Sequence, residues 1–375
     1  MNSEKQIRFL KTTEGKAQVA IISKLASFPG GVKTYVDMLL SEQNSSYNRV
    51  VFNSMQNLKR HSLDLLHFQE PDFLSSFDYS IPALVSLHNH DAYCASGTKF
   101  FRADGIECSR KLSVLGCTFG HLVNHCGSRR PWKFVSSLRM AFSNRNELST
   151  KPVTILANSN FVRNQMIDNG VPAEKIHTLL CGILVDEDVF ANAKVRTDRL
   201  AFAGRIVATK GLDVLLYALQ RTRKSVCLDV IGEGWDLQRC QLLSEKLGIA
   251  DRITWHGLLR HDAIHQIMNR SRAVIFPSRW PEPAGLITLE AYRAHTCVIA
   301  SNLGGIPEYV VHGQTGILFD PNKIDELVRA INQISESPAL ADEMGKKGNE
   351  LLRRKFRLET HLAALQEFYD RALQD

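Results

Sequence analysis

The sequence of 375 residues contains no apolar run that approaches the roughly 20 residues needed to span a membrane. Its first residues also lack the charged and then apolar layout of a secretory signal peptide. We therefore expect a cytoplasmic location, either free or at the inner face of the membrane. No internal repeat or low-complexity tract is visible, and a content of 44% hydrophobic and 23% charged residues is typical of a globular protein.

Cysteine is sparse, with eight residues in the whole chain. This number is too small for a disulfide scaffold, so reduced thiols are the expected state. A zinc site is an alternative for four of the cysteines and two nearby histidines: Cys94, Cys108, Cys117 and Cys126 with His121 and His125. Their spacings are wide and include no C-x-x-C pair, so metal binding by these residues stays open.

The length allows two domains of ordinary size, and the net charge of +7 is unevenly distributed between them. Residues 99–145 carry nine Lys and Arg but two acidic residues. This stretch is either a surface that meets anionic lipid or an anionic acceptor, or a solvated basic face. Nucleic acid is not expected as a partner, because no recognition-helix, zinc-finger or RNP pattern accompanies the charge.

The second half alternates short apolar runs with helical patterns, which predicts a parallel sheet covered on both faces. The expected strands are 200–203, 226–231, 253–255, 273–276, 297–300 and 316–319. The expected helices are 211–222, 235–247, 261–270, 285–295 and 323–335. A ligand of such a sheet lies beyond the carboxyl ends of its strands.

The first half has a looser pattern of the same kind. Strands are expected at 17–22, 49–52, 63–67, 82–87 and 153–157, with helices at 32–42 and 160–169. Residues 91–150 have no clean period and are either a long functional excursion or a helical insert. The pattern predicts domains at 1–190 and 191–356, separated within a polar stretch, and a helix at 357–375 that packs back on the first domain.

Two glutamates eight residues apart mark the most informative stretch of the chain. Glu282 lies in a loop after a predicted buried strand, and Glu290 lies in the first turns of the helix that follows. Backbone N–H groups at this helix start, where the dipole favours anions, belong to Ala284, Gly285 and Leu286. Carboxylates that bind hydroxyls beside an anion site suit a ligand that is part sugar and part phosphate.

A glycine turn with two cations follows the predicted strand at 200–203. Gly204 lets the backbone approach a ligand closely, Arg205 can grip phosphate oxygens with two N–H groups, and Lys210 adds a point charge. Taken alone, the stretch is better interpreted as an ordinary loop with solvated cations. Beside the two glutamates, a phosphate site is the better interpretation.

A second glycine pair and a histidine stand at strand ends in the first half. Gly30 and Gly31 form a weaker candidate for an anion loop, because adjacent glycines are common in turns. Neither glycine stretch has the G-x-G-x-x-G pattern, so a cofactor for hydride transfer is not supported. His88 follows the predicted strand 82–87, where ligand contacts are frequent, whereas a structural role is favoured for His90.

Together these stretches resemble the family 4 retaining glycosyltransferases, glycosyl transferases group 1, nearly from end to end. Glu282 and Glu290 resemble the family's pair of glutamates separated by seven residues, and residues 202–211 look like its nucleotide-diphosphate loop. Gly30-Gly31 looks like its first-domain glycine loop, and His88 falls where such enzymes carry a histidine. The resemblance implies the GT-B fold, an α/β architecture of two Rossmann-like domains with parallel sheets facing across a cleft.

The resemblance also implies an activity, the transfer of a hexose from a UDP- or GDP-sugar to a saccharide or lipid-linked hydroxyl, in cell-surface polysaccharide or lipopolysaccharide synthesis. Glu282 would hold sugar hydroxyls, Glu290 the ribose, and His88 the donor sugar. Arg205 and Lys210, with the helix start, would stabilise the leaving diphosphate without a metal or other cofactor.

Two alternatives remain open from the sequence alone. One is a sugar-nucleotide epimerase on the same fold, which would use the donor site without an acceptor surface. The other is a saccharide-binding protein that has kept the fold without catalysis. The sequence identifies neither the base and sugar of the donor nor the acceptor.

Overall fold

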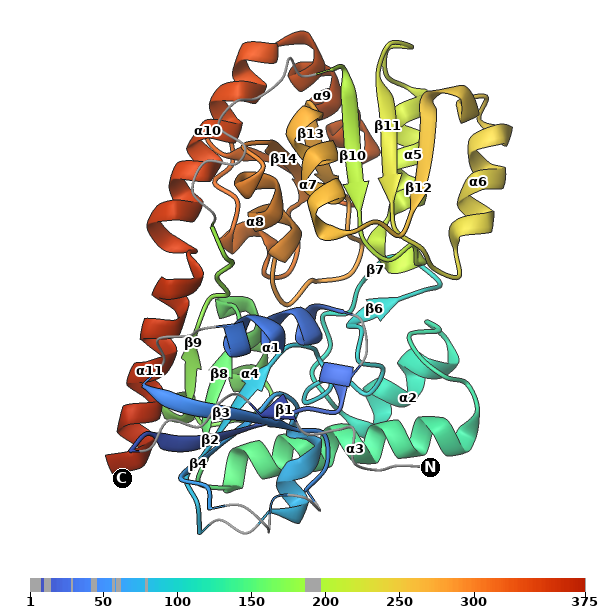
Figure 1. Ribbon diagram of the computed structural model, residues 1–375. Coiled ribbons are helices and arrows are strands. Elements are labelled where there is room, and N and C mark those ends of the chain that lie inside the picture. Colours follow the sequence, from blue (N-terminus) through green and yellow to red (C-terminus); the bar gives the residue numbers. More distant parts are fainter. Residues whose placement is uncertain are drawn as a thin grey trace, which may run out of the picture. The chain divides into compact units, whose positions relative to one another are not determined.

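The computed structural model in Figure 1 describes residues 8–9, 15–27, 30–41, 46–55, 58, 62–77, 80–185 and 197–374. The chain divides into two compact units. The first consists of Met1–Ala103, Ser109–Leu184 and Leu358–Asp375, and the second of Asp104–Cys108 and Val185–Arg357. The predicted boundary between residues 190 and 191 lies outside the described residues.

The sheet of the first unit has the strand order β1-β3-β2-β4-β5-β8-β9 in the part of the chain that the structure describes. Its strands are β1 (Arg8–Phe9), β2 (Ala17–Ile22), β3 (Tyr47–Phe52), β4 (Leu65–Phe68), β5 (Ala83–Leu87), β8 (Thr154–Ala157) and β9 (Ile176–Thr178). All neighbours pair in parallel except β1 with β3. Parallel strands are covered on both faces, which explains why β3, β4 and β5 are buried along their whole length. The helices α1 (Gly31–Ser41) and α4 (Asn160–Asp168) belong to the same unit.

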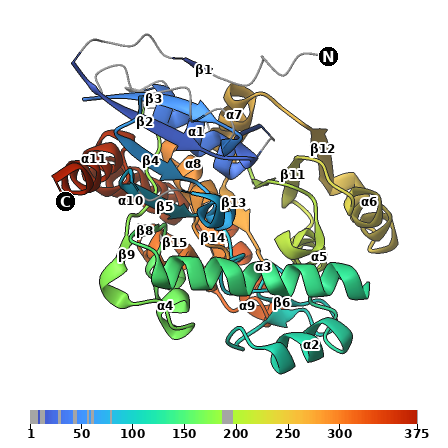
Figure 2. The same cartoon turned by 90° about the horizontal axis from the view of Figure 1, so that it is seen from below.

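Residues 91–150 form a helical insert, which was one of the two predicted alternatives. It contains α2 (Val114–Leu122) and α3 (Pro131–Thr150), which lie side by side in Figures 1 and 2. Two short strands precede them, β6 (Phe100–Phe101) and β7 (Ile106–Glu107). The period was unclear because both helices carry many exposed apolar side chains, so their sequences do not separate an apolar from a polar face.

The last helix, α11 (Leu358–Gln374), packs on the sheet of the first unit. His361 Nε2 lies 2.9 Å from the Tyr35 hydroxyl, and the Tyr369 hydroxyl lies 2.7 Å from His67 Nδ1. All four side chains are buried. Paired buried polar groups fix the position of a helix more closely than apolar contact alone.

The second unit has a parallel sheet with the strand order β12-β11-β10-β13-β14-β15 among the described residues. Its strands are β10 (Arg199–Ala203), β11 (Cys227–Ile231), β12 (Ile253–Gly257), β13 (Ala273–Phe276), β14 (Cys297–Ser301) and β15 (Gly316–Phe319). The helices are α5 (Leu212–Gln220), α6 (Leu237–Lys246), α7 (His261–Arg270), α8 (Leu286–Arg293), α9 (Ile324–Glu336) and α10 (Pro338–Lys355). Every strand and helix expected in this half is present, with ends that differ by up to two residues.

The sequence did not predict α10, because its low hydropathy and two glycines argue against a helix. The structure explains both glycines. A Cβ at Gly345 would lie 2.1 Å from the His295 carbonyl oxygen, and one at Gly348 would lie 2.3 Å from the Tyr292 ring. The glycines therefore allow α10 to approach the end of α8 closely. No helix in the described part of the chain combines the length and apolarity that crossing a membrane would require.

Candidate active site

The loops that follow β10 and β13 form the centre of the candidate site in the second unit. The two strands are parallel neighbours, so both loops emerge at the carboxyl edge of the sheet. The Arg279 amide donates to the Thr209 carbonyl oxygen at 2.8 Å, and the Ser278 hydroxyl oxygen lies 3.3 Å from the same oxygen. These interactions hold the two loops together and bring their side chains into contact.

Lys210 and Glu282, 72 positions apart in the sequence, form an ion pair between these loops. The distance from Lys210 Nζ to Glu282 Oε1 is 2.6 Å, and the Ser278 hydroxyl donates to the same oxygen at 2.8 Å. The glutamate side chain is 7% exposed and the lysine side chain 20%. A buried carboxylate with a cation and a hydroxyl donor is well satisfied, and the ammonium group has more N–H donors than this pair uses.

Two glycines allow the surrounding loops to close around this pair. Gly211 has a φ of 71°, and a Cβ there would lie 1.9 Å from the Pro277 carbonyl oxygen. Gly304 has a φ of 63°, and a Cβ there would lie 2.6 Å from both the amide nitrogen and the carbonyl oxygen of Glu282. The next residue, Gly305, donates its N–H to that carbonyl at 2.7 Å. The loop after β14 therefore supports the backbone of Glu282.

Arg205 is exposed on the same loop as Lys210. Within the described ranges, its guanidinium group has no ion-pair partner in the protein, so its charge faces solvent. The preceding residue, Gly204, donates its N–H to the Ile231 carbonyl at 3.0 Å. The neighbouring loop approaches so closely that a Cβ at Gly232 would lie 2.0 Å from the Gly204 oxygen. The loop is therefore fixed at its base while its cation remains accessible.

The predicted anion-binding helix start is formed by α8. Gly285 precedes the helix, which begins at Leu286, and Ala284 lies one residue earlier in the loop that contains Glu282. The Thr288 amide bonds back to the Gly285 carbonyl at 2.8 Å. The amides of Leu286 and Ile287, which precede Thr288 in the first turn, have no acceptor in an earlier turn of the helix, so they can donate to an anion.

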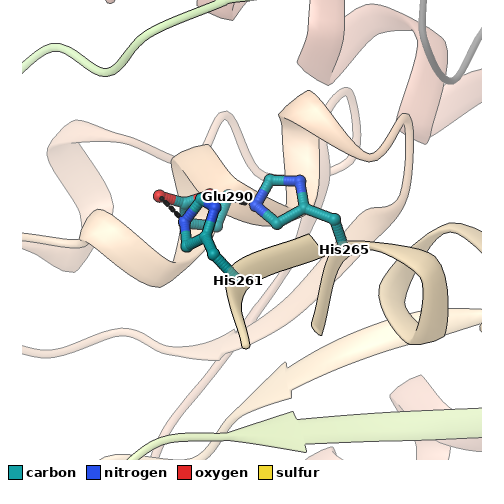
Figure 3. A group of neighbouring side chains, drawn as sticks. All are labelled: His261, His265 and Glu290. Atoms are coloured by element: carbon teal, nitrogen blue, oxygen red, sulfur yellow. Dashed lines mark hydrogen bonds and ion pairs between the residues drawn. The ribbon is translucent and has the colours of Figure 1, made fainter. Parts of the chain in front are cut away.

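Glu290, further along α8, has partners that the sequence did not predict. Its Oε2 lies 2.5 Å from His265 Nε2, and its Oε1 lies 3.5 Å from His261 Nε2 (Figure 3). Burial raises the pKa of Glu290, but the two histidines outweigh it and lower that pKa to about 2. The same interaction raises the pKa of His261. Glu290 is therefore a carboxylate at neutral pH, held between two imidazoles.

The remaining predicted residues belong to the first unit. Gly30 precedes α1, whose first residue is Gly31. His88 follows β5, and its Nε2 lies 2.8 Å from Gln69 Oε1. Burial, together with His361, lowers the pKa of His88 to about 4, so the imidazole is neutral at pH 7. His90 is buried and bonds to the Tyr93 hydroxyl, which fits the structural role favoured for it.

The cysteines considered for zinc do not gather into a metal site in the described part of the chain. The group of three His, Cys, Asp or Glu side chains whose ligand atoms come within 4.8 Å there is His261, His265 and Glu290. The sequence could have indicated this group, because His261 and His265 are four residues apart on a predicted helix and such residues lie on the same face.

Comparisons with known proteins show which family and fold this chain resembles. Residues 186–351 match the family model described as glycosyl transferases group 1. The GDP-mannose-dependent alpha-(1-6)-phosphatidylinositol monomannoside mannosyltransferase of Mycobacterium tuberculosis is 28% identical over 274 residues, which cover 68% of this chain and 69% of that protein. The glycogen synthase of the same organism is 30% identical over 185 residues, covering 48% of this chain and 44% of the relative. The chain thus spans less than half the length of that synthase.

The fold is similar to that of solved glycosyltransferases. HepE from Anabaena, crystallised in complex with UDP, superimposes with a TM-score of 0.70 at 18% identity, covering 94% of this chain and 99% of HepE. WaaG, a glycosyltransferase involved in lipopolysaccharide biosynthesis, gives a TM-score of 0.65 at 14% identity, covering 92% and 98%. These matches confirm the predicted α/β class with two Rossmann-like domains of the GT-B fold.

Proposed function

We propose that this chain, whose residues 186–351 belong to the glycosyl transferases group 1 and whose fold is GT-B, transfers a hexose from a nucleotide-diphosphate sugar to a hydroxyl group with retention of the anomeric configuration. The observation that carries the proposal is the contact between Lys210 and Glu282, beside the exposed Arg205 and the start of α8. Lys210 and Glu282 thus meet on the loops that follow β10 and β13, and the same two loops carry Arg205 and the start of α8.

The leaving diphosphate gains negative charge as the glycosidic bond breaks. Arg205 is exposed and can bind phosphate oxygens through two N–H groups, and the first amides of α8 can donate to others. Lys210 adds positive charge from a position fixed by Glu282. These groups supply the stabilisation that a metal ion provides in other phosphate chemistry, so we propose a transfer that needs no metal.

The carboxylates would hold the hydroxyl groups of the donor. Glu282 Oε1 already accepts hydrogen bonds from Lys210 and Ser278, so a sugar hydroxyl would donate to Oε2. Glu290 is ionised and would accept from the ribose hydroxyls. The role of His88, in the first unit, stays a prediction; its imidazole is neutral at pH 7, so it would form a hydrogen bond without adding charge.

The base of the donor is proposed to be uracil or guanine, as the relatives support. The mycobacterial mannosyltransferase is named for its dependence on GDP-mannose, and HepE was crystallised with UDP-glucose. A thermal-shift screen against UDP- and GDP-hexoses tests this, because a ligand that binds the folded state raises Tm. We expect one donor to raise the Tm of the wild type and much less that of Arg205→Ala. A panel without any shift, in a protein that unfolds cooperatively, would contradict the proposal.

The chemistry itself needs a separate assay. The donor that gives the shift would be incubated with and without candidate saccharide or lipid-linked acceptors, and the product's anomeric configuration read by NMR. Transfer with retention is expected. Formation of an epimer of the donor in the absence of acceptor would instead support an epimerase.

The acceptor is proposed to be lipid-linked, at the surface of an anionic membrane, and to belong to cell-surface polysaccharide synthesis. The support is a set of exposed apolar and basic side chains within residues 102–140, a segment that includes α2 and the first half of α3. The exposed apolar residues are Val114, Leu115, Phe119, Leu122, Val123, Trp132, Val135 and Met140. The exposed basic residues in the same segment are Arg102, Lys111, Arg129, Arg130, Lys133 and Arg139.

Such a surface suits the interface of an anionic bilayer. Leu115 is 85% exposed and Trp132 is 68% exposed, and each has an exposed lysine within four positions in the sequence, Lys111 and Lys133 respectively. Apolar side chains with tryptophan insert at the headgroup boundary, and each nearby Lys or Arg adds about 1 kcal/mol of attraction to anionic lipid. The proposal therefore places this segment against the membrane.

Co-sedimentation with vesicles tests the membrane contact. The wild type should sediment with vesicles of phosphatidylglycerol and phosphatidylcholine, but not with phosphatidylcholine alone. Leu115→Glu and Trp132→Glu should each weaken this binding. The matched control is Leu242→Glu, which changes a residue of α6 that is 58% exposed. Equal loss in the control, or no binding by the wild type, would contradict the assignment.

A further inference from the structure

Three side chains on neighbouring helices converge in the second unit outside the contacts described for Lys210 and Glu282. His261 and His265 lie one turn apart on α7 and extend toward the carboxylate of Glu290 on α8 (Figure 3). One ligand atom from each lies within 4.8 Å of the others. The two helices pack on each other, which fixes this convergence.

We propose that His261, His265 and Glu290 form a binding site for a divalent transition-metal ion of the zinc class, and that this ion competes with the nucleotide for Glu290. The competition, unlike the metal site itself, depends on the function proposed above.

The ligand set decides the class of metal. Two imidazoles with one carboxylate are a typical donor set for zinc, which accepts nitrogen and oxygen ligands and leaves a further position open to water. Magnesium and calcium prefer sites built from oxygen ligands alone. Histidines at positions i and i+4 present their rings on the same face of a helix, so His261 and His265 can bind one ion without distortion of α7.

The distances need little adjustment. The Glu290 oxygens lie 2.5 Å from His265 Nε2 and 3.5 Å from His261 Nε2. Ligand atoms that share one tetrahedral zinc ion at bonds of about 2.0–2.1 Å lie roughly 3.3 Å apart. If Oε2 binds the ion, its contact with His265 Nε2 must lengthen by under about 1 Å, whereas Oε1 already lies at a suitable distance from His261 Nε2.

Access from solvent also favours a cation at this site. The side chains of Glu290 and His265 are 19% and 2% exposed, whereas that of His261 is 56% exposed. His261 therefore gives an ion a route from solvent to an otherwise buried carboxylate. A metal ion must displace the protons of the imidazoles, so its binding weakens as the pH falls.

The metal ion and the nucleotide would compete because both would bind the carboxylate oxygens of Glu290. Glu290 is proposed to accept hydrogen bonds from the ribose hydroxyls through the same oxygens that would bind the ion. A bound ion removes these lone pairs and places positive charge where hydroxyl donors would lie. Nucleotide binding and metal binding are then coupled with opposite effect, and each weakens the other by the same factor.

Metal binding would be measured first, on the full chain without nucleotide. Metal-free protein would be titrated with Zn²⁺ against a chromophoric chelator at about pH 7.5. The eight cysteines can also bind zinc, so the measurement is a difference between variants. The wild type should bind one equivalent more than His261→Ala and one more than His265→Ala. The control His312→Ala, which changes an exposed histidine outside the group, should match the wild type.

A second probe identifies the ligands. Co²⁺ in place of Zn²⁺ should give weak visible bands from nitrogen and oxygen ligands that are absent in His261→Ala. His261 is more than half exposed, so its replacement should leave the fold intact even if His265→Ala unfolds. Equal stoichiometry and affinity in wild type and His261→Ala would overturn the metal site.

The competition has its own readout. Binding of UDP and GDP would be measured by calorimetry with one equivalent of Zn²⁺ and without it. We expect zinc to weaken nucleotide binding to the wild type by about tenfold or more, on the usual scale of coupling between sites. His261→Ala in the same solutions accounts for zinc bound directly by the nucleotide. Unchanged nucleotide affinity would overturn the competition, whereas failure of metal-free protein to bind any nucleotide would instead overturn the proposed function.

Discussion

Replacing Lys210 by methionine tests whether its pair with Glu282 supports both the fold and the chemistry. The charged atoms lie 2.6 Å apart, and both side chains are largely buried. At an effective dielectric constant of about 20, the attraction is about 6 kcal/mol, and the desolvation of the two ions offsets much of it. Removing the lysine alone leaves a buried carboxylate whose described donor is the Ser278 hydroxyl. We expect a loss of about 3 kcal/mol in the free energy of unfolding.

Thermal unfolding is the assay. For a unit of this size, about 3 kcal/mol lowers Tm by roughly 6–12 °C. The double variant Lys210→Met/Glu282→Gln should recover more than half of that loss, because a neutral amide can remain buried beside Ser278. Lys224→Met, which changes an exposed lysine, is the matched control and should leave Tm unchanged.

Sugar transfer should respond differently from stability. Both Lys210→Met and the double variant should lose turnover by about a hundredfold or more, because the charge near the diphosphate is gone in each. Recovery of Tm without recovery of transfer separates the two roles of the lysine. A Tm for Lys210→Met within about 2 °C of the wild type would refute the reasoning about the buried pair.

Further predictions concern single residues. Arg205→Ala should lower turnover by about a hundredfold while leaving Tm unchanged, because the side chain is exposed; transfer kinetics beside thermal unfolding check this. Glu290→Ala should weaken nucleotide binding more than it slows turnover at saturating donor, and a larger effect on turnover would assign Glu290 to the sugar instead. Gly304→Ala should cost about 1–3 kcal/mol, measured by urea unfolding, because its φ of 63° is strained for alanine and a Cβ meets the Glu282 backbone. Burial holds the pKa of His88 and of His361 at about 4, so the unfolded chain takes up protons first and stability should fall as the pH drops from about 6.5 toward 4. Thermal unfolding across that range measures the fall, and His361→Asn should make it shallower.

The local pattern of the sequence was sufficient to predict the sheet of the second unit. Each strand is a short apolar run and each predicted helix has its own period, so neighbours along the chain carry the information. The same holds for Gly204, Arg205 and the start of α8, which follow strands whose carboxyl ends share one edge. The spacing of apolar residues did not predict α2 and α3, because these helices expose many apolar side chains. It did not predict α10 either, because the two glycines of that helix are there for a close contact with α8.

What the sequence determined by itself is therefore the class of fold and the loops on which the site residues stand. The tertiary structure alone decided which side chains meet. Lys210 pairs with Glu282 because Thr209 accepts a hydrogen bond from the loop after β13, and Glu290 lies between His261 and His265 because α7 packs on α8. Contacts between residues distant in sequence depend on how elements pack, and packing leaves no local period in the chain.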